Sequence, residues 1–346
     1  MTPATLDAYL NSYIAEVHDP VRTQVAETVR AFASAAIQVR KSINEGALGA
    51  AFAATRGAAH ADGDVQKELD VHADDLFLEA ARKAGVAWYA SEELANAVAV
   101  DEKSGVAVAI DPLDGSSNID TNVSIGTIFA ILPNLGDEAT TFRQPGKNQL
   151  AAGFFIYGPQ MALAVTLGAG TKIFVFSSRV GAFVEAYKTV SISPDTKEYA
   201  INTSNYRHWD ETTRCYVDDC IQGSEGPRDK DFNMRWIASL VAEAYRILIR
   251  GGVFLYPRDV RKGYAKGRLR LVYEANPIAF IMEQAGGAAT EGASRILDLE
   301  PGDIHQRTPL VFGSAKEVAK FGRYHTDPSA IGSRHPLFGN RGLFRA

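Results

Sequence analysis

The sequence contains very little cysteine. Only Cys215 and Cys220 occur among its 346 residues. If residues 211–221 are helical, these two side chains lie on different faces, so a disulfide between them is not expected. Two scattered cysteines are typical of a reducing compartment, which favours the cytoplasm and argues against a redox switch.

A strong charge of one sign and membrane-directed segments are also missing. The formal net charge is −5, which argues against a general surface for nucleic acid or acidic membrane. No apolar run approaches the roughly 20 residues that span a bilayer. The start, MTPATLDAYLNSYIAEVHDP, carries acids early and lacks the basic-then-apolar order of a secretory signal. We therefore expect a cytoplasmic protein without nucleic-acid or membrane partners.

What is present is typical of a folded α/β protein. Hydrophobic residues make up 46% and charged residues 22% of the chain, and its length allows one large or two medium domains. Short apolar strands dominate from about residue 106 to 190, and helices and strands alternate afterwards. The pattern predicts a layered α/β protein with an N-terminal domain over 1–190, a C-terminal domain over 191–325 and a loosely attached tail over 326–346.

Apolar periodicity places the individual elements. Helices are predicted at 20–44, from residue 65 onward, and at 210–221, 232–249 and 277–285. Strands are predicted at 105–110, 127–132, 150–157, 162–166, 172–176, 252–256 and 269–273. The Gly- and Ala-rich stretch 46–63 has no clear period, so it is predicted to be a mobile loop that closes over a site and supplies Asp64.

The densest acidic cluster is DPLDGSSNID, residues 111–120. It follows the apolar strand 105–110, so Asp111 is expected at the end of that strand, where Pro112 resists helix. Asp114 and Gly115 predict a tight turn, because glycine tolerates a positive φ. The turn exposes backbone N–H groups and the hydroxyls of Ser116 and Ser117. The segment therefore offers oxygen ligands for divalent cations and, beside them, a loop that suits an anion.

Further carboxylates stand in comparable positions. Glu92 and Glu93 follow the apolar run 86–89, and Glu274 precedes a helix that we expect Asn276 to cap. Adjacent surface acids and helix caps are the simpler explanations when each group is considered alone. Asp64 and Asp70 flank the start of the helix predicted from residue 65, where Asp64 could also be the N-cap.

Cationic and aromatic residues are candidates for the far end of a substrate. Arg268 and Arg270 alternate along a predicted strand and are therefore expected on the same side. Arg235 is placed on the predicted helix 232–249, where its guanidinium could bind a phosphate with two hydrogen bonds. Tyr256 ends a predicted strand, and Asn202 lies in the segment INTSNY.

These blocks resemble class I fructose-1,6-bisphosphatase, a family of the lithium-sensitive phosphatase superfamily. The resemblance covers residues 63 to 320 and rests on GDVQKELDV, SEE, DPLDGSSNID, SIGTIF, GGVFLYP, LRLVYEANP, EQAGG and DIHQR, in this order. It implies an αβαβα sandwich, usually assembled as a homotetramer, and hydrolysis of the C1 phosphate of fructose 1,6-bisphosphate with two or more Mg²⁺ ions per subunit.

The resemblance also implies roles for individual residues. The implied metal ligands are Glu92, Asp111, the carbonyl of Leu113, Asp114 and Glu274. Asp114, Gly115, Ser116 and Ser117 would meet the 1-phosphate and the sugar, and Asn202, Tyr256 and Arg268 the 6-phosphate. Arg235 would reach a neighbouring subunit's site. Asp64, Asp70 and Glu93 are the candidates for activating the attacking water.

Several positions depart from the family pattern. Arg268 stands where the family commonly has Lys. Asn205 and Trp236 occupy positions that are often Tyr, and Tyr206 is a candidate to compensate for the first. The AMP-binding turn of the animal enzymes is absent and Ser104 replaces a Lys used there, so we predict weak or no AMP inhibition. The Cys-bearing insertion of the chloroplast form is missing too, and the chain resembles bacterial enzymes of the carbon-fixation type.

Three alternatives stay open at this point. Within hydrolases, the chain could act on both fructose 1,6-bisphosphate and sedoheptulose 1,7-bisphosphate. An inositol or nucleotide phosphatase fits SEE and LRLVYEANP less well. A non-catalytic sugar-phosphate sensor of the same fold would be expected to lack one or more of the carboxylates, yet all are present. The pathway would be gluconeogenesis or the Calvin cycle.

Overall fold

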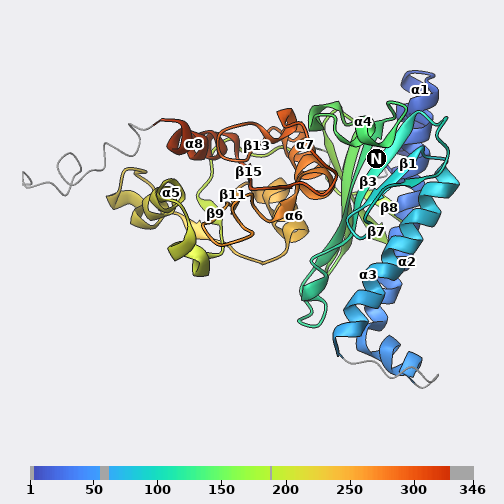
Figure 1. Ribbon diagram of the computed structural model, residues 1–346, viewed down its shortest axis with the longest axis horizontal. Helices are drawn as coiled ribbons and strands as arrows, with labels where there is room; N and C mark the ends of the chain where they lie inside the picture. Colours follow the sequence, from blue (N-terminus) through green and yellow to red (C-terminus); the bar gives the residue numbers. More distant parts are fainter. Residues whose placement is uncertain (1–3, 55–61, 188, 328–346) are drawn as a thin grey trace, which may run out of the picture.

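Five layers, alternately helical and β, make up the protein (Figure 1). The structure, a computed structural model, describes residues 4–54, 62–187 and 189–327, with the backbone alone for 46–54 and 62–67. The first layer holds α1 (Leu6–Glu16), α2 (Pro20–Ala54) and α3 (Asp62–Ala84). The third holds α6 (Leu240–Arg250) and α7 (Asn276–Gln284), and the fifth α5 (Glu211–Gln222) and α8 (Ala315–Thr326). The predicted αβαβα sandwich is confirmed.

The larger sheet forms the second layer, with strand order β2-β1-β3-β4-β5-β6-β7-β8. Strands β1 and β3 are parallel, and the other neighbours are antiparallel. Its strands are β1 (Trp88–Ser91), β2 (Val98–Ala99), β3 (Val106–Asp114), β4 (Ile125–Pro133), β5 (Ala151–Tyr157), β6 (Met161–Thr166), β7 (Thr171–Ser177) and β8 (Ala182–Glu185). The short helix α4 (Glu138–Phe142) follows β4.

The smaller sheet forms the fourth layer, with strand order β10-β9-β11-β15-β13. Its strands are β9 (Glu198–Ala200), β10 (Asn233–Met234), β11 (Val253–Tyr256), β13 (Ala288–Thr290) and β15 (Leu310–Gly313). A separate pair, β12 (Leu269–Arg270) with β14 (Arg307–Thr308), precedes and follows the third-layer helix α7 in the chain.

Apolar seams hold the layers together. Along β4, Phe129 packs into the seam below α2 and α3, whereas its neighbour Ile128 packs into the seam with α6 and α7. Successive side chains of a strand point to opposite faces, and both faces of this sheet are covered. That is why the strands of its centre are continuous apolar runs rather than alternating ones. In the first seam, Phe32 meets the Phe77 and Phe129 rings edge-on, at 5.2 and 5.4 Å between centroids.

The outermost seam contains a buried ion network. Glu317 of α8, with only 4% of its side chain exposed, pairs with Arg228 and, at 3.0 Å, with Lys230. The hydroxyl of Tyr216 donates to the same carboxylate at 3.0 Å. A carboxylate this deeply buried is stable only because cations and donors surround it.

Three predictions about elements are wrong. The predicted loop 46–63 is helical up to Ala54 and again from Asp62, because its alanines are strong helix formers; residues 55–61 lie outside the described part. The helix predicted from 232 begins at Leu240, where Ser239 accepts a hydrogen bond from the Ala242 N–H at 3.3 Å. The residues before this helix are in extended conformation instead, and the Arg235 N–H donates to the carbonyl of Tyr199 at 2.7 Å.

The strand predicted at 269–273 is also too long. After Arg270 the chain enters a π-helical turn, Leu271–Ala275, that runs directly into α7. Glu274 stabilises this turn, since its Oε2 accepts the Arg270 N–H at 2.6 Å. Asn276 is therefore the first α-helical residue and caps nothing.

Both cysteines are free, as the sequence predicts; Cys220 is buried and Cys215 is partly exposed. The described part of the chain contains no helix that combines the length and the apolar character needed to cross a membrane. The tail predicted over 326–346 lies outside the described residues from 328 onward.

Candidate active site

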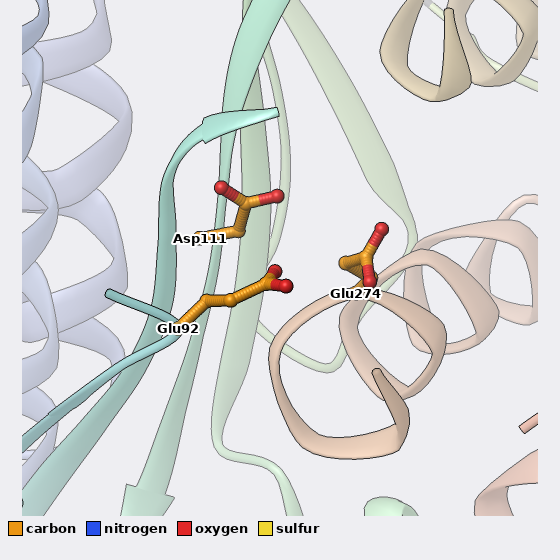
Figure 2. Close-up of side chains that lie close together, drawn as sticks. All are labelled: Glu92, Asp111 and Glu274. Carbon is orange, nitrogen blue, oxygen red and sulfur yellow. The ribbon is translucent and has the colours of Figure 1, made fainter. Parts of the chain in front are cut away.

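Three acidic side chains from distant parts of the sequence converge at the seam between the larger sheet and α7. Figure 2 shows Glu92, which follows β1, Asp111 of β3 and Glu274 of the π-helical turn. One carboxylate oxygen from each lies within 4.8 Å of the others. The predicted convergence of these three groups is thus observed.

Strand β3 is built to present two acids at this seam. Strand β1 pairs with it only as far as Ile110, so Pro112 interrupts no ladder on that side. On the other side, the register with β4 shifts between Asp111 and Asp114. In a regular strand these two residues would point to opposite faces; the irregularity lets both carboxylates act on one cluster. The strand therefore continues to Asp114 and does not end at Asp111 as predicted.

The turn after β3 has the predicted form. Gly115 adopts φ 76°, and a short 3-10 turn, Ser116–Asn118, follows. The Asn118 amide donates to the carbonyl of Ala238 at 2.9 Å, which fastens the loop to the start of α6. From the same helix, the Val241 N–H donates to Asp114 Oδ2 at 3.2 Å. The positive end of α6 thus faces this carboxylate.

The electrostatics of the cluster favour a bound cation. Burial and then the neighbouring acids raise the pKa of Asp111 and of Glu274 well above the usual range. Burial also raises the pKa of Asp114 to about 7. Buried carboxylates without opposite charge are costly, and divalent cations with oxygen preference remove that cost. These residues fit a Mg²⁺ site.

Arg270 is the guanidinium that faces the cluster, a role that sequence reasoning missed. Its Nε donates to Glu92 Oε1 at 3.1 Å, and its Nη1 donates to the carbonyl of His305 at 2.9 Å. Arg268 instead lies against the rings of Tyr256 and Tyr264. The prediction that the two arginines share one side of a strand is therefore wrong, because the strand begins only at Leu269 and Arg268 lies outside it.

Asp70 and Glu93 lie beside the cluster. Burial and the Glu92 charge raise the pKa of Asp70, while a hydrogen bond from Ser116 lowers it. Oxygen Oδ1 of Asp70 is buried and has no hydrogen-bond partner among the described residues. Burial, followed by the Asp70 charge, raises the pKa of Glu93. An unpaired buried oxygen next to acidic groups is a suitable contact for a water or a cation.

Asp64 and Leu113 are the remaining residues that the sequence predicts for the metal site and its surroundings. Asp64 lies in the first turn of α3 and not at its N-cap, since that helix begins at Asp62; its side chain is outside the described part. Leu113 donates its N–H to Asp111 Oδ1 at 3.1 Å, which orients one of the acids.

A small open pocket lies at the end of β11. Several predicted or noted residues line it: Asn202, Asn205, Tyr256 and Arg268. Tyr206 does not compensate for Asn205 here, because its hydroxyl donates to Asp218 at 3.0 Å and the ring is not part of the pocket wall. Arg235 is not part of the wall either; its Nε lies 3.5 Å from Glu198.

Comparison with known proteins agrees with this geometry. The family profile described as fructose-1-6-bisphosphatase, N-terminal domain, matches residues 16–188, and the corresponding C-terminal domain profile matches residues 192–326. A protein of Rhizobium meliloti (strain 1021) named fructose-1,6-bisphosphatase class 1 is 63% identical, with both chains covered over 100% of their length. Another of that name, from Azorhizobium caulinodans, is 54% identical over 94% of this chain and 100% of its own.

Solved structures give the same result. Leishmania major fructose-1,6-bisphosphatase matches in apo form with a TM-score of 0.81 and in holo form with 0.80, each at 29% identity over 94% of this chain and 100% of that chain. Fold and matches together define an enzyme of carbohydrate metabolism, a phosphatase that hydrolyses phosphoric monoesters. The chain belongs to the class 1 fructose-1,6-bisphosphatase family. The family resemblance predicted from the sequence is confirmed.

The raised pKa values predict how pH affects the metal-free protein. Below about pH 4, Asp114 is protonated in both the folded and the unfolded chain and imposes no penalty. Between that value and its folded pKa of about 7, only the unfolded chain releases the proton, so stability falls as pH rises. In EDTA, we expect a lower Tm at pH 8 than at pH 5, with Asp114 contributing on the order of a few kcal/mol.

The Asp114→Asn variant is the control for this melting experiment. It should show a smaller decrease in Tm over the same pH interval, and excess Mg²⁺ should remove most of the wild-type decrease. Carboxylates whose pKa is lowered, such as Glu317, act in both proteins and cancel in the comparison. Equal decreases in the wild type and the variant would contradict the assignment.

Proposed function

We propose that this enzyme hydrolyses the C1 phosphate of fructose 1,6-bisphosphate and that the seam cluster holds two or more Mg²⁺ ions for the reaction. The observation that carries the proposal is the acidic set Glu92, Asp111 and Glu274, of which the last two are buried. Beside it lies the buried Asp114, whose pKa is raised by burial and by the Glu92 charge. The acidic cluster and the pocket with Arg268 supply the two kinds of binding that a bisphosphate needs, one for the reacting phosphate and one for the distal phosphate. The relatives' name, fructose-1,6-bisphosphatase class 1, supports this substrate.

The proposed ligands are Glu92, Asp111, the carbonyl of Leu113, Asp114 and Glu274. Bound divalent cations would supply positive charge to the phosphoryl oxygens and to the departing sugar oxygen. The turn over 115–117 offers backbone N–H groups and hydroxyls to the reacting phosphate. Asp70 and Glu93, whose pKa values are raised, are suited to take a proton from the attacking water, with Asp64 as a further candidate.

The overall reaction adds water to phosphorus and breaks the bond between phosphorus and the C1 oxygen. The proton that the water loses returns to that oxygen, so the products are fructose 6-phosphate and phosphate. Asn202, Tyr256 and Arg268 would hold the 6-phosphate, and Arg235 would serve the site of a neighbouring subunit. We accordingly propose a cytoplasmic homotetramer that works in gluconeogenesis or the Calvin cycle, with weak or no inhibition by AMP.

Phosphate release from fructose 1,6-bisphosphate tests the proposal. We expect turnover with Mg²⁺, none after treatment with EDTA, and little change on adding AMP. Sedoheptulose 1,7-bisphosphate, assayed in parallel, would reveal dual specificity if it is hydrolysed at a comparable kcat/KM. No release from either compound would refute the proposal and favour a sugar-phosphate sensor.

A further inference from the structure

The pocket at the end of β11 contains a second arginine, Arg261, to which the family resemblance gave no role. Arg261 lies in the loop between β11 and β12 and is part of the pocket wall together with Arg268. The two guanidinium carbons are 4.6 and 4.7 Å from the centroid of the same ring, that of Tyr264. Two positive charges therefore gather around one aromatic ring at the edge of this pocket.

Two hydrogen-bond partners, Asp259 and Asn205, hold the guanidinium of Arg261 in place. Its Nε donates to both carboxylate oxygens of Asp259 at 3.1 Å, and its Nη2 donates to Asp259 Oδ2 as well. Nη2 also donates to Asn205 Oδ1 at 3.0 Å. Because two partners hold one edge of the planar guanidinium, little conformational entropy remains to be lost when its other edge binds a ligand.

Donors remain available on both arginines. Within the described residues, nothing accepts a hydrogen bond from Nη1 of Arg261 or from the guanidinium of Arg268. Asp259 is itself satisfied, since it accepts from the side chain and the N–H of Arg261, the latter at 2.9 Å. Two guanidinium groups against one carboxylate leave the pocket with net positive charge. Guanidinium donors match the oxygens of a phosphate well.

The loop that carries these residues is closed on itself. The Tyr264 N–H donates to the carbonyl of Arg261 at 3.0 Å, and the Gly267 N–H donates to that of Tyr264 at 2.9 Å. Gly267 has φ 80°, and a Cβ there would lie 2.2 Å from the backbone of Thr308 and Pro309. The loop is thus tied together by its own backbone and packs closely against the end of β14.

We propose that Arg261 is a second guanidinium ligand for the distal phosphate of the substrate, positioned by Asp259 and Asn205. The inference rests on the proposed function, because it assigns this pocket to the phosphate that is not hydrolysed. Arg261 binds the distal phosphate through its free edge, together with the guanidinium of Arg268 in the same pocket wall. The pocket thereby favours a substrate that carries the distal phosphate over fructose 1-phosphate, which lacks it.

Steady-state kinetics with Arg261→Gln test this assignment. For fructose 1,6-bisphosphate, we expect KM to rise roughly tenfold or more, because hydrogen bonds to a charged ligand are lost, with a much smaller change in kcat. Fructose 1-phosphate lacks the distal phosphate, so its kcat/KM should fall far less. Arg258→Gln is the matched control: it lies in the same loop, is mostly exposed and is not part of the pocket wall.

Calorimetric titration with fructose 6-phosphate gives a second readout that needs no turnover. Arg261→Gln should weaken this binding by a factor similar to the rise in KM, and Arg261→Lys, which keeps the charge and the pairing with Asp259, should have an intermediate effect. Should the Gln variant fail to fold, the Lys variant carries the test. Equal losses on the two substrates, wild-type affinity in the Gln variant, or no binding of fructose 6-phosphate by the wild type would overturn the assignment.

The two proposals can fail separately. A wild type that releases no phosphate from any bisphosphate, yet binds fructose 6-phosphate in a manner that depends on Arg261, would refute the proposed reaction and support the distal site. A wild type that turns over fructose 1,6-bisphosphate with no dependence on Arg261 would do the opposite.

Discussion

Asp114→Asn is expected to abolish Mg²⁺-dependent phosphate release without unfolding the protein. Asp114 is 7% exposed, and its Oδ2 accepts only the Val241 N–H among the described residues, so an amide oxygen can keep this contact. The substitution removes one negative charge from the cluster that we propose binds the cations. We expect activity to fall at least a thousandfold, which is about 4 kcal/mol of transition-state stabilisation.

The same Asp114→Asn substitution should raise, not lower, the stability of the metal-free protein. Because burial raises the pKa of Asp114, the carboxylate is unfavourable near neutral pH when no cation is present, and Asn relieves that cost. In EDTA at pH 8, the variant should therefore melt at or above the wild-type temperature. Asp120→Asn makes the same charge change on an exposed position of the same loop and should leave activity near the wild-type value. Unchanged turnover in Asp114→Asn would refute the metal-site assignment.

Glu317→Gln is expected to produce the largest loss of stability. The side chain of Arg228 is 1% exposed and relies on the Glu317 carboxylate as its anionic partner. Without that charge, the buried guanidinium is uncompensated, which typically costs about 3–5 kcal/mol. In a chain of this size the loss corresponds to a decrease in Tm of roughly 5 °C.

Lys316→Gln is the matched control for this variant. It lies next to Glu317 on α8, and its own ion pair with Asp195 is exposed on both sides, at 65% and 60%. Exposed pairs contribute at most about 1 kcal/mol, so its Tm should remain close to the wild-type value. A Glu317→Gln protein that melts with the control would show that the buried network adds nothing to stability.

The layers and the family were predictable from the sequence because their signals are local. Continuous apolar strands such as 127–132 indicate a sheet that is covered on both faces. The segment DPLDGSSNID contains acidic residues and a turn with hydroxyls within ten consecutive residues. The convergence of Glu92 with Glu274 could be expected only from the family resemblance. The local sequence around Glu92 or Glu274 contains no signal for the distant residues that it contacts in the fold.

The errors arose where tertiary contacts decide the local structure. Leu269–Tyr273 has the composition of a strand, yet Glu274 bonds back to the Arg270 N–H and forces a π-helical turn. For the same reason, Arg270 was expected beside Arg268 at the far end of the substrate, whereas it contacts Glu92 of the acidic cluster. Long-range side-chain contacts, which sequence periodicity does not encode, determine the network of Arg228, Lys230 and Glu317. They also determine the position of Arg261.

The proposed ligands come from both halves of the protein: Asp111 and Asp114 belong to the larger sheet, Glu92 directly follows its strand β1, and Glu274 lies in the segment before α7. A cation bound among them would link the second layer to the third. Whatever shifts these layers by a fraction of an ångström would then change the affinity for the ion, and by reciprocity the ion would resist that shift. The alignment of the layers could therefore serve as a control on catalysis, exerted from a distance and without any additional group at the reacting phosphate.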